Sequence, residues 1–212
     1  MDFNKEVLFL GAGASVEAGA PLLSNFFKKG FELLEDNSIL LKEQEKECLK
    51  YIKLRRQEIF QNSNIEEFYS YLDLAESNQA FKTFNEKPGS IIDKLNYFIS
   101  ITLEKSLETP PAQIKDTYKE ILRRNYSRII TTNWDLLLEQ EGPDGTIDFS
   151  SEHVLNLHGA LNWIVCNNCN RARTFDKKIL SEYYESYYSK NHVKEHRFIC
   201  TDCNKSMKPG II

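Results

Sequence analysis

Apolar residues follow two different patterns along this chain, short continuous runs and helical spacing, and the change of pattern divides the chain into segments. Val7-Leu-Phe-Leu10 is a continuous apolar run that ends at a glycine, which predicts a strand buried on both faces of a parallel sheet. Over residues 22–125 the apolar positions recur at helical spacing, which predicts a large helical insertion. Apolar runs at 127–131 and 154–157 predict two further strands. Strands that alternate with helical segments indicate an α/β fold with a parallel sheet.

Boundary signals refine the helical segments. Residues 15–20 are predicted to open a helix after the first strand, and Asn64 with Glu67 forms a capping-box pattern that predicts another helix start. Lys87-Pro-Gly89 is expected to break the chain before an amphipathic helix over 91–103. The apolar face expected for the helix after Asn64 consists of Phe68, Tyr71, Leu72 and Ala75. Further helical patterns lie at 114–122, 136–140 and 183–188.

Composition narrows the class of protein. With 212 residues, 41% hydrophobic and 27% charged, the chain suits a soluble protein with one sizeable core and a small accessory module. A net charge of -4 supplies no basic field for phosphates, which argues against nucleic acid as a direct ligand. The N-terminus lacks a signal-peptide layout and no apolar run reaches the roughly 20 residues that span a bilayer, so we expect a cytoplasmic protein without membrane contact.

Polar blocks follow each of the three predicted strands. They are Gly11-Ala-Gly-Ala-Ser15, Thr131-Thr-Asn-Trp-Asp135 and His158-Gly159. Ligands of open parallel sheets bind beyond the carboxyl ends of the strands. The three blocks are therefore expected to converge on one ligand site.

The glycine block suits a phosphate-bearing ligand. Gly11-x-Gly13 between a strand and a helix allows a tight turn and close approach of the backbone to a pyrophosphate. The usual dinucleotide fingerprint has a third glycine where Val16 stands, and Gly19 comes later, which argues against an ordinary dehydrogenase. A tight strand-to-helix turn without a ligand also accounts for the two glycines.

Four of the five cysteines form two closely spaced pairs. Cys166-x-x-Cys169 and Cys200-x-x-Cys203 can each supply two thiolates to a tetrahedral Zn²⁺, and four cysteine ligands leave no open position for catalysis. We therefore predict a structural zinc module over residues 166–206, against free thiols or a redox role. Asn170 and Asn204 follow the pairs, where a positive φ is often needed. Cys48 is interpreted as filler in a helix.

In this order, the four blocks resemble the sirtuin family. The string over 11–21 resembles the first sirtuin motif, which implies that Gly11, Ala12, Gly13, Ser15 and Ala20 line the NAD pyrophosphate and ribose. The resemblance of the second block implies that Thr132, Asn133 and Asp135 contact the nicotinamide-side ribose. Leu157-His-Gly159 resembles the catalytic segment, which implies that His158 is the general base. Without the resemblance, His158 is interpreted as a structural histidine, and Asn133 and Asp135 are interpreted as caps of a helix that starts at Leu136.

The resemblance implies an enzyme that consumes NAD. Cleavage of the nicotinamide–ribose bond builds oxocarbenium-like charge, which a hydrogen-bonded ribose and a nearby carboxylate stabilise. The blocks are most similar to bacterial sirtuin-like domains that deplete NAD in anti-phage defence, so we predict catalytic His158, Asn133 and Asp135 and hydrolysis to nicotinamide and ADP-ribose. Deacylating sirtuins continue after Pro21 with an Arg-containing segment, whereas this chain reads Leu22-Leu-Ser-Asn-Phe26.

Two alternative functions stay open at this point. The zinc module favours an NAD-dependent protein deacylase, and a cleft that binds a nucleotide without turnover would make the chain a sensing domain. The resemblance also implies gating of activity by homo-oligomerisation or by an activating protein partner. It gives a Rossmann-like NAD-binding domain over 1–165, the zinc module, and the start of a return to the main sheet over 207–212, with the second half of the nucleotide-binding fold not included.

Overall fold

The computed structural model describes residues 6–78, 88–107, 124, 126–138, 154–166, 168–174 and 198–211. Contacts divide the chain into two compact units. The first, here called the sheet unit, contains Met1–Ala20, Ser106–Lys177 and Phe198–Ile212. The second, the helical unit, contains Pro21–Lys105 and Lys178–Arg197. The domain boundaries that the sequence suggests remain predictions.

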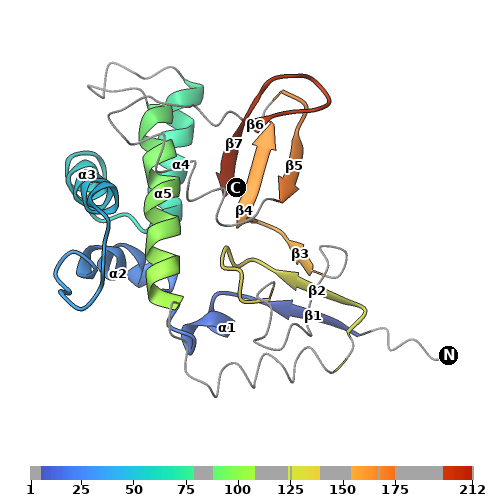
Figure 1. The fold of residues 1–212 in the computed structure, drawn as a ribbon, viewed down its shortest axis with the longest axis horizontal. Helices are drawn as coiled ribbons and strands as arrows, with labels where there is room; N and C mark the ends of the chain where they lie inside the picture. Colours follow the sequence, from blue (N-terminus) through green and yellow to red (C-terminus); the bar gives the residue numbers. More distant parts are fainter. Residues whose placement is uncertain are drawn as a thin grey trace. The chain divides into compact units, whose positions relative to one another are not determined.

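A parallel three-stranded sheet forms the first part of the sheet unit (Figure 1). Its strands are β1 (Val7–Leu10), β2 (Arg128–Thr131) and β3 (Val154–Asn156), in the order β1-β2-β3. Leu10 pairs with Thr131, and Thr131 pairs with Asn156, so all three strands end at the same edge. The predicted α/β class with a parallel sheet is confirmed.

The two faces of this sheet differ in exposure. On one face, Ile129, Thr131 and Val154 are buried. On the other, Val7 is 53% exposed, Phe9 60% and Leu155 45%. The prediction that β1 is buried on both faces is therefore wrong. A continuous apolar run satisfies either arrangement, and whether a second layer covers the sheet depends on the rest of the fold.

The first helix is shorter than predicted and starts earlier. α1 covers Gly13–Val16, instead of opening at Ser15 and running to Ala20. The chain then folds back, because the Ser15 carbonyl accepts hydrogen bonds from the N–H groups of Ala18 and Ala20, both at 3.1 Å. Gly19 has a φ of 99°, a left-handed conformation that ends the helix and suits glycine.

Four strands form a second sheet in the same unit. β4 (Gly159–Cys166) pairs antiparallel with β5 (Arg171–Thr174) and with β7 (Ser206–Ile211). β6 (Phe198–Ile199) pairs with β7, which gives the order β5-β4-β7-β6. Residues 207–211, expected to begin a return to the main sheet, lie instead in this second sheet, where Gly159 pairs with Ile211.

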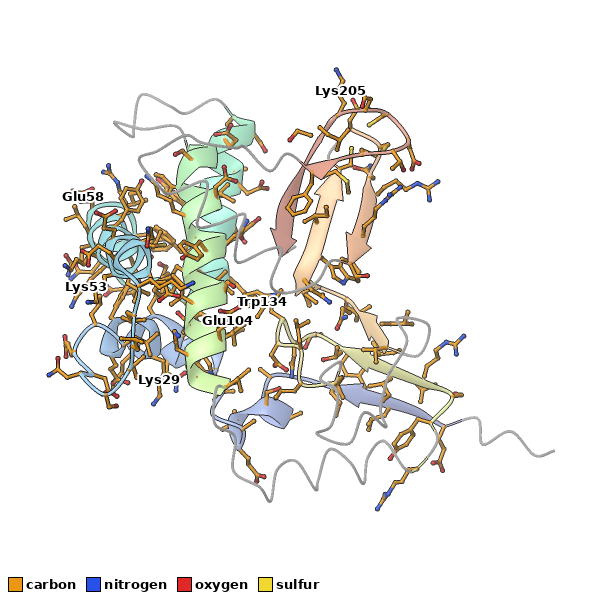
Figure 2. The ribbon with its side chains drawn as sticks, in the orientation of Figure 1. Lys29, Lys53, Glu58, Glu104, Trp134 and Lys205 are labelled. Carbon is orange, nitrogen blue, oxygen red and sulfur yellow. The ribbon has the colours of Figure 1, made fainter. Side chains whose placement is uncertain are left out.

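The helical unit has an aromatic core. After the turn η1 (Leu23–Asn25), its helices are α2 (Phe26–Glu32), α3 (Glu43–Ile59), α4 (Ile65–Ser77) and α5 (Pro88–Leu107). The Phe27 ring lies 5.7 Å from that of Phe68 and 5.5 Å from that of Phe98, between ring centroids. Charged residues of α3 such as Lys53 and Glu58 lie on its outer surface (Figure 2). Cys48, the predicted filler, is buried.

The boundaries of α4 and α5 follow side-chain chemistry. Asn64 Oδ1 accepts the Glu67 N–H at 3.0 Å, and Glu67 Oε2 accepts the Asn64 N–H at 2.9 Å, which confirms the capping box. The predicted apolar face of α4 is correct except for Tyr71, which is 40% exposed, while Ile65 is buried. The predicted helix boundary falls at Pro88, which is the first residue of α5, where its missing N–H costs nothing; the helix therefore starts three residues before the predicted Ile91.

Several predicted elements lie outside the described residues. These are the helices at 114–122 and 183–188 and most of the helix at 136–140, of which only a turn at Leu137 and Leu138 is described. Within the described part of the chain, no helix is both long and apolar enough to cross a membrane.

Candidate functional site

The three polar blocks meet at the carboxyl edge of the parallel sheet. The Thr132 N–H donates to the Leu10 carbonyl at 3.1 Å, which ties the second block to the end of β1. The Leu157 N–H donates to the Thr131 carbonyl at 2.9 Å, which ties the residue before His158 to the end of β2. A Cβ built on Gly11 would lie 3.9 Å from Thr132 Oγ1, so the glycine turn faces the second block.

Ser15 joins the glycine block to the Asn/Asp block through its side chain. Asn133 Nδ2 donates to Ser15 Oγ at 2.8 Å, and the Ser15 hydroxyl in turn bonds to the Asp135 carboxyl. Ser15 is only 1% exposed, so this Ser15–Asn133–Asp135 network is shielded from solvent at its centre. No group among the described residues donates to Asn133 Oδ1, although that atom is buried. The network therefore contains one buried acceptor without a donor among the described residues.

Asp135 is the titratable group of the network. It is 7% exposed, and burial raises the pKa of its carboxyl, against the opposing effect of the hydrogen bond from Ser15. Asp135 Oδ1 also accepts the Leu137 N–H at 3.1 Å. The carboxyl thus bonds both to Ser15 and to the turn that follows it, and the capping and ligand-binding roles of Asp135 both stay predictions.

His158 lies beyond the end of β3 at the same edge. Its side chain is exposed, and it forms no hydrogen bond or ion pair with another described residue. Gly159, with a φ of 73°, turns the chain immediately after it into β4. The histidine is therefore accessible to a ligand, and its role as general base stays a prediction.

Three further residues are predicted to contact the cofactor: Ala12, Gly13 and Ala20. Gly13 is exposed, and a Cβ built on it would meet nothing within 4 Å, so the backbone there is open to a ligand. Ala12 is half-buried, and Ala20 is buried at 7% exposure. The structure places these residues together without assigning them a ligand.

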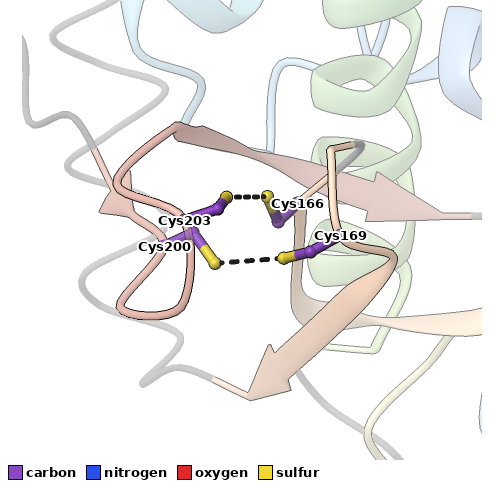
Figure 3. Close-up of side chains that lie close together, drawn as sticks. All are labelled: Cys166, Cys169, Cys200 and Cys203. Carbon is purple, nitrogen blue, oxygen red and sulfur yellow. Dashed lines mark hydrogen bonds between the residues drawn. The ribbon is translucent and has the colours of Figure 1, made fainter.

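The four cysteines form one cluster in the second sheet. Their Sγ atoms all lie within 4.8 Å of one another, and Cys166–Cys203 and Cys169–Cys200 are each 3.4 Å apart (Figure 3). Four sulfurs around a tetrahedral Zn²⁺ at about 2.3 Å are about 3.8 Å apart, which falls within this geometry. Cys166 and Cys200 are buried and the other two half-buried. The residues fit a closed structural metal site.

Local backbone geometry explains how each pair presents two thiols. Asn170 has a φ of 52° and Asn204 a φ of 55°, which confirms the predicted positive φ after each pair. The Asn204 N–H donates to the Cys200 carbonyl at 2.8 Å and closes the second turn. Asp202 connects the turns to β5 through ion pairs with Arg171 and Arg173.

Sequence reasoning missed one polar residue at the centre of this edge. Thr131 is 2% exposed, and its Oγ1 accepts the Asn133 N–H at 3.0 Å. The available signal was the Thr-x-Asn spacing, since a threonine hydroxyl often bonds the N–H two residues on. The carbonyl of the next residue, Trp134, accepts the Leu161 N–H at 3.0 Å.

Comparison with known proteins does not establish the family of this chain. No protein-family model matches the chain, and no curated protein does. One solved structure that it matches is described as "The Structural basis of Sirtuin Substrate Affinity". The alignment covers 97% of this chain and 59% of that chain, with 16% identity and a TM-score of 0.35. The chain thus spans less than two thirds of the matched protein, at a similarity too low to establish a shared family.

Proposed function

We propose that this chain is a sirtuin-like enzyme that cleaves the nicotinamide–ribose bond of NAD⁺ and transfers the ribosyl centre to water. The observation that carries the proposal is the Ser15–Asn133–Asp135 network, which links the glycine turn to the Asn/Asp block at the carboxyl edge of a parallel sheet. This is the position where such sheets bind nucleotides.

The proposed pose places the pyrophosphate at the glycine turn and the nicotinamide-side ribose at the network. The open backbone at Gly13 allows close approach of a phosphate. A ribose hydroxyl would donate a hydrogen bond to Asn133 Oδ1, the buried acceptor that has no donor among the described residues. Asp135, when ionised, would stabilise the positive charge that develops on the sugar as nicotinamide leaves with the bonding electron pair.

Water completes the reaction. Its oxygen bonds to the anomeric carbon, its proton passes to a base, and the products are nicotinamide, ADP-ribose and one proton. An exposed imidazole at the edge can accept that proton, and we assign this role to His158. The zinc held by the cysteine cluster would keep the second sheet folded and would take no part in the chemistry.

The test is nicotinamide release from NAD⁺ by the zinc-loaded chain. His158→Ala and Asn133→Ala should each lower kcat by at least about 100-fold. Asn96→Ala is the matched control, because it removes a buried Asn in the helical unit: it should lower the melting temperature but keep kcat within about threefold. Undiminished turnover in His158→Ala would remove the proposed base.

The four-cysteine cluster favours a second candidate, an NAD-dependent protein lysine deacylase. The same assay separates the two when an acyl-lysine peptide is added. Release that needs the peptide and yields O-acyl-ADP-ribose identifies a deacylase, whereas peptide-independent release that yields ADP-ribose identifies a hydrolase. Intact NAD⁺ after long incubation with folded protein would instead favour a nucleotide-sensing domain.

We also propose, from the resemblance alone, that the activity depletes NAD in bacterial anti-phage defence and is gated by self-assembly or by a partner protein. The cellular measurement is the NAD content of infected bacteria that express the chain or its His158→Ala variant. We expect NAD to fall after infection only with the unmodified chain. Equal NAD levels in both strains would remove the defence role without affecting the enzymatic assignment.

A further inference from the structure

We propose that Thr131 is a positioning residue of this site, which holds Asn133 and the chain segment before His158 in register. The inference rests on the proposed function, because it concerns the residues assigned to NAD cleavage. Thr131 is the last residue of β2, is 2% exposed, and has a polar side chain on the buried face of the sheet. It needs no ligand contact to act.

The hydroxyl of Thr131 determines the path of the chain after the strand. Its Oγ1 accepts the Asn133 N–H at 3.0 Å, which bends the backbone immediately beyond β2. With the backbone held in this turn, Asn133 Nδ2 reaches Ser15 Oγ at 2.8 Å and leaves Oδ1 without a donor among the described residues. Loss of the hydroxyl would free Asn133 from this orientation.

The carbonyl of the same residue holds the neighbouring strand. It accepts the Leu157 N–H at 2.9 Å, one residue before His158. On the opposite side, the Thr132 N–H donates to the Leu10 carbonyl at 3.1 Å. One dipeptide thus bonds to both adjacent strand ends, and the Thr131 hydroxyl adds the bond that aims Asn133.

A purely structural role predicts different behaviour from a positioning role. Valine has the same shape as threonine and is favoured in strands, so Thr131→Val should keep β2 while it removes the acceptor of the Asn133 N–H. Thr131→Ser keeps that acceptor. If only packing matters, valine should be the milder change; if the hydroxyl positions Asn133, serine should be.

The first experiment is steady-state NAD⁺ cleavage by three variants beside the unmodified chain. Thr131→Val should lower kcat about 10- to 100-fold and change KM by less than about threefold, and Thr131→Ser should restore kcat to within about threefold. The matched control is Thr102→Val, a buried threonine of α5 whose Oγ1 bonds the Phe98 carbonyl at 2.7 Å. It should leave kcat within about twofold.

Three results would overturn the inference while the chain is active: unchanged kcat in Thr131→Val, no rescue by serine, or an equal loss in Thr102→Val. If the unmodified chain releases no nicotinamide, the proposed function fails and the hydrogen bond is tested by NMR. In Thr131→Val the Asn133 amide proton should then shift upfield and exchange about tenfold faster or more, while the Leu157 amide stays unchanged. An unchanged Asn133 amide would overturn the positioning role itself.

Discussion

The cysteine cluster and the Ser15–Asn133–Asp135 network are two polar centres of one unit, but they are assembled in different ways. Each half of the cluster is a short turn, and a bound metal ion can draw the two halves together. In the network, by contrast, the pairing of β1 and β2 in register brings Ser15 and Asn133 together, and their side chains bond directly to each other. We therefore expect removal of the metal to unfold one module, and single changes in the network to disturb chemistry more than folding.

The largest expected effect comes from the metal. Structural zinc contributes about 10–16 kcal/mol of apparent binding free energy in small zinc modules. Chelation, or Cys200→Ser, should therefore abolish the ordered structure of the cysteine module. Zinc content should fall from about one equivalent per chain to well below it in the variant.

Cys48→Ala is the matched control for this change. Cys48 is buried, and its Sγ donates to the Lys94 carbonyl at 3.3 Å in the helical unit, so its loss should leave the zinc content unchanged. Elemental analysis combined with hydrogen exchange over β4 to β7 measures both effects. If these strands stayed fully protected from hydrogen exchange in metal-free protein, the cysteine module would not need the metal to fold, and the two centres would not differ in the way we expect.

An intermediate effect is expected at Gly19. This residue has a φ of 99°, and a Cβ there would lie 2.6 Å from the Ser106 carbonyl oxygen. Gly19→Ala should therefore destabilise the fold by about 1–3 kcal/mol and displace the turn that surrounds the Ser15 carbonyl. Chemical denaturation measures the loss of free energy of unfolding.

Gly13→Ala is the matched control for Gly19→Ala. Gly13 lies in α1 and a Cβ there would meet nothing within 4 Å, so stability should change by less than about 0.5 kcal/mol or increase slightly. Equal losses of stability in the two variants would mean that neither the positive φ of Gly19 nor its close approach to Ser106 determines the effect.

The smallest expected effect is a pH dependence of stability at Asp135. Because burial raises the pKa of this carboxyl in the folded protein, its contribution to stability is present below the unfolded pKa and is lost as pH rises through the folded value. Asp135→Asn stays neutral and avoids this loss, so it should melt about 1–4 °C higher at pH 7 while it lowers NAD⁺ cleavage.

The difference in melting temperature should shrink as pH falls below the folded pKa of Asp135, where the native carboxyl also becomes neutral. Thermal melts of both proteins from pH 4 to 8 measure it. A variant that melts lower than the native chain at every pH would mean that the hydrogen bonds of Asp135 outweigh its burial.

Local chemistry explains what the sequence by itself determined. The capping box at Asn64, the apolar period of α5 and the positive φ at Asn170 and Asn204 each depend on residues a few positions apart. The same holds for the cysteine pairs, whose spacing within each turn defines two ligands at once. The α/β class followed from strands that alternate with helical segments.

Only the tertiary structure decided features that depend on distant residues. The exposed face of β1, the end of α1 at Val16 and the place of β7 in the second sheet follow from which element packs or pairs beside each segment. The same applies to Ser15, which bonds a residue 118 positions away, and to Thr131, whose hydroxyl matters because the strand end is buried. Periodicity reports the local conformation of a segment, whereas burial and side-chain partners are properties of the assembled chain.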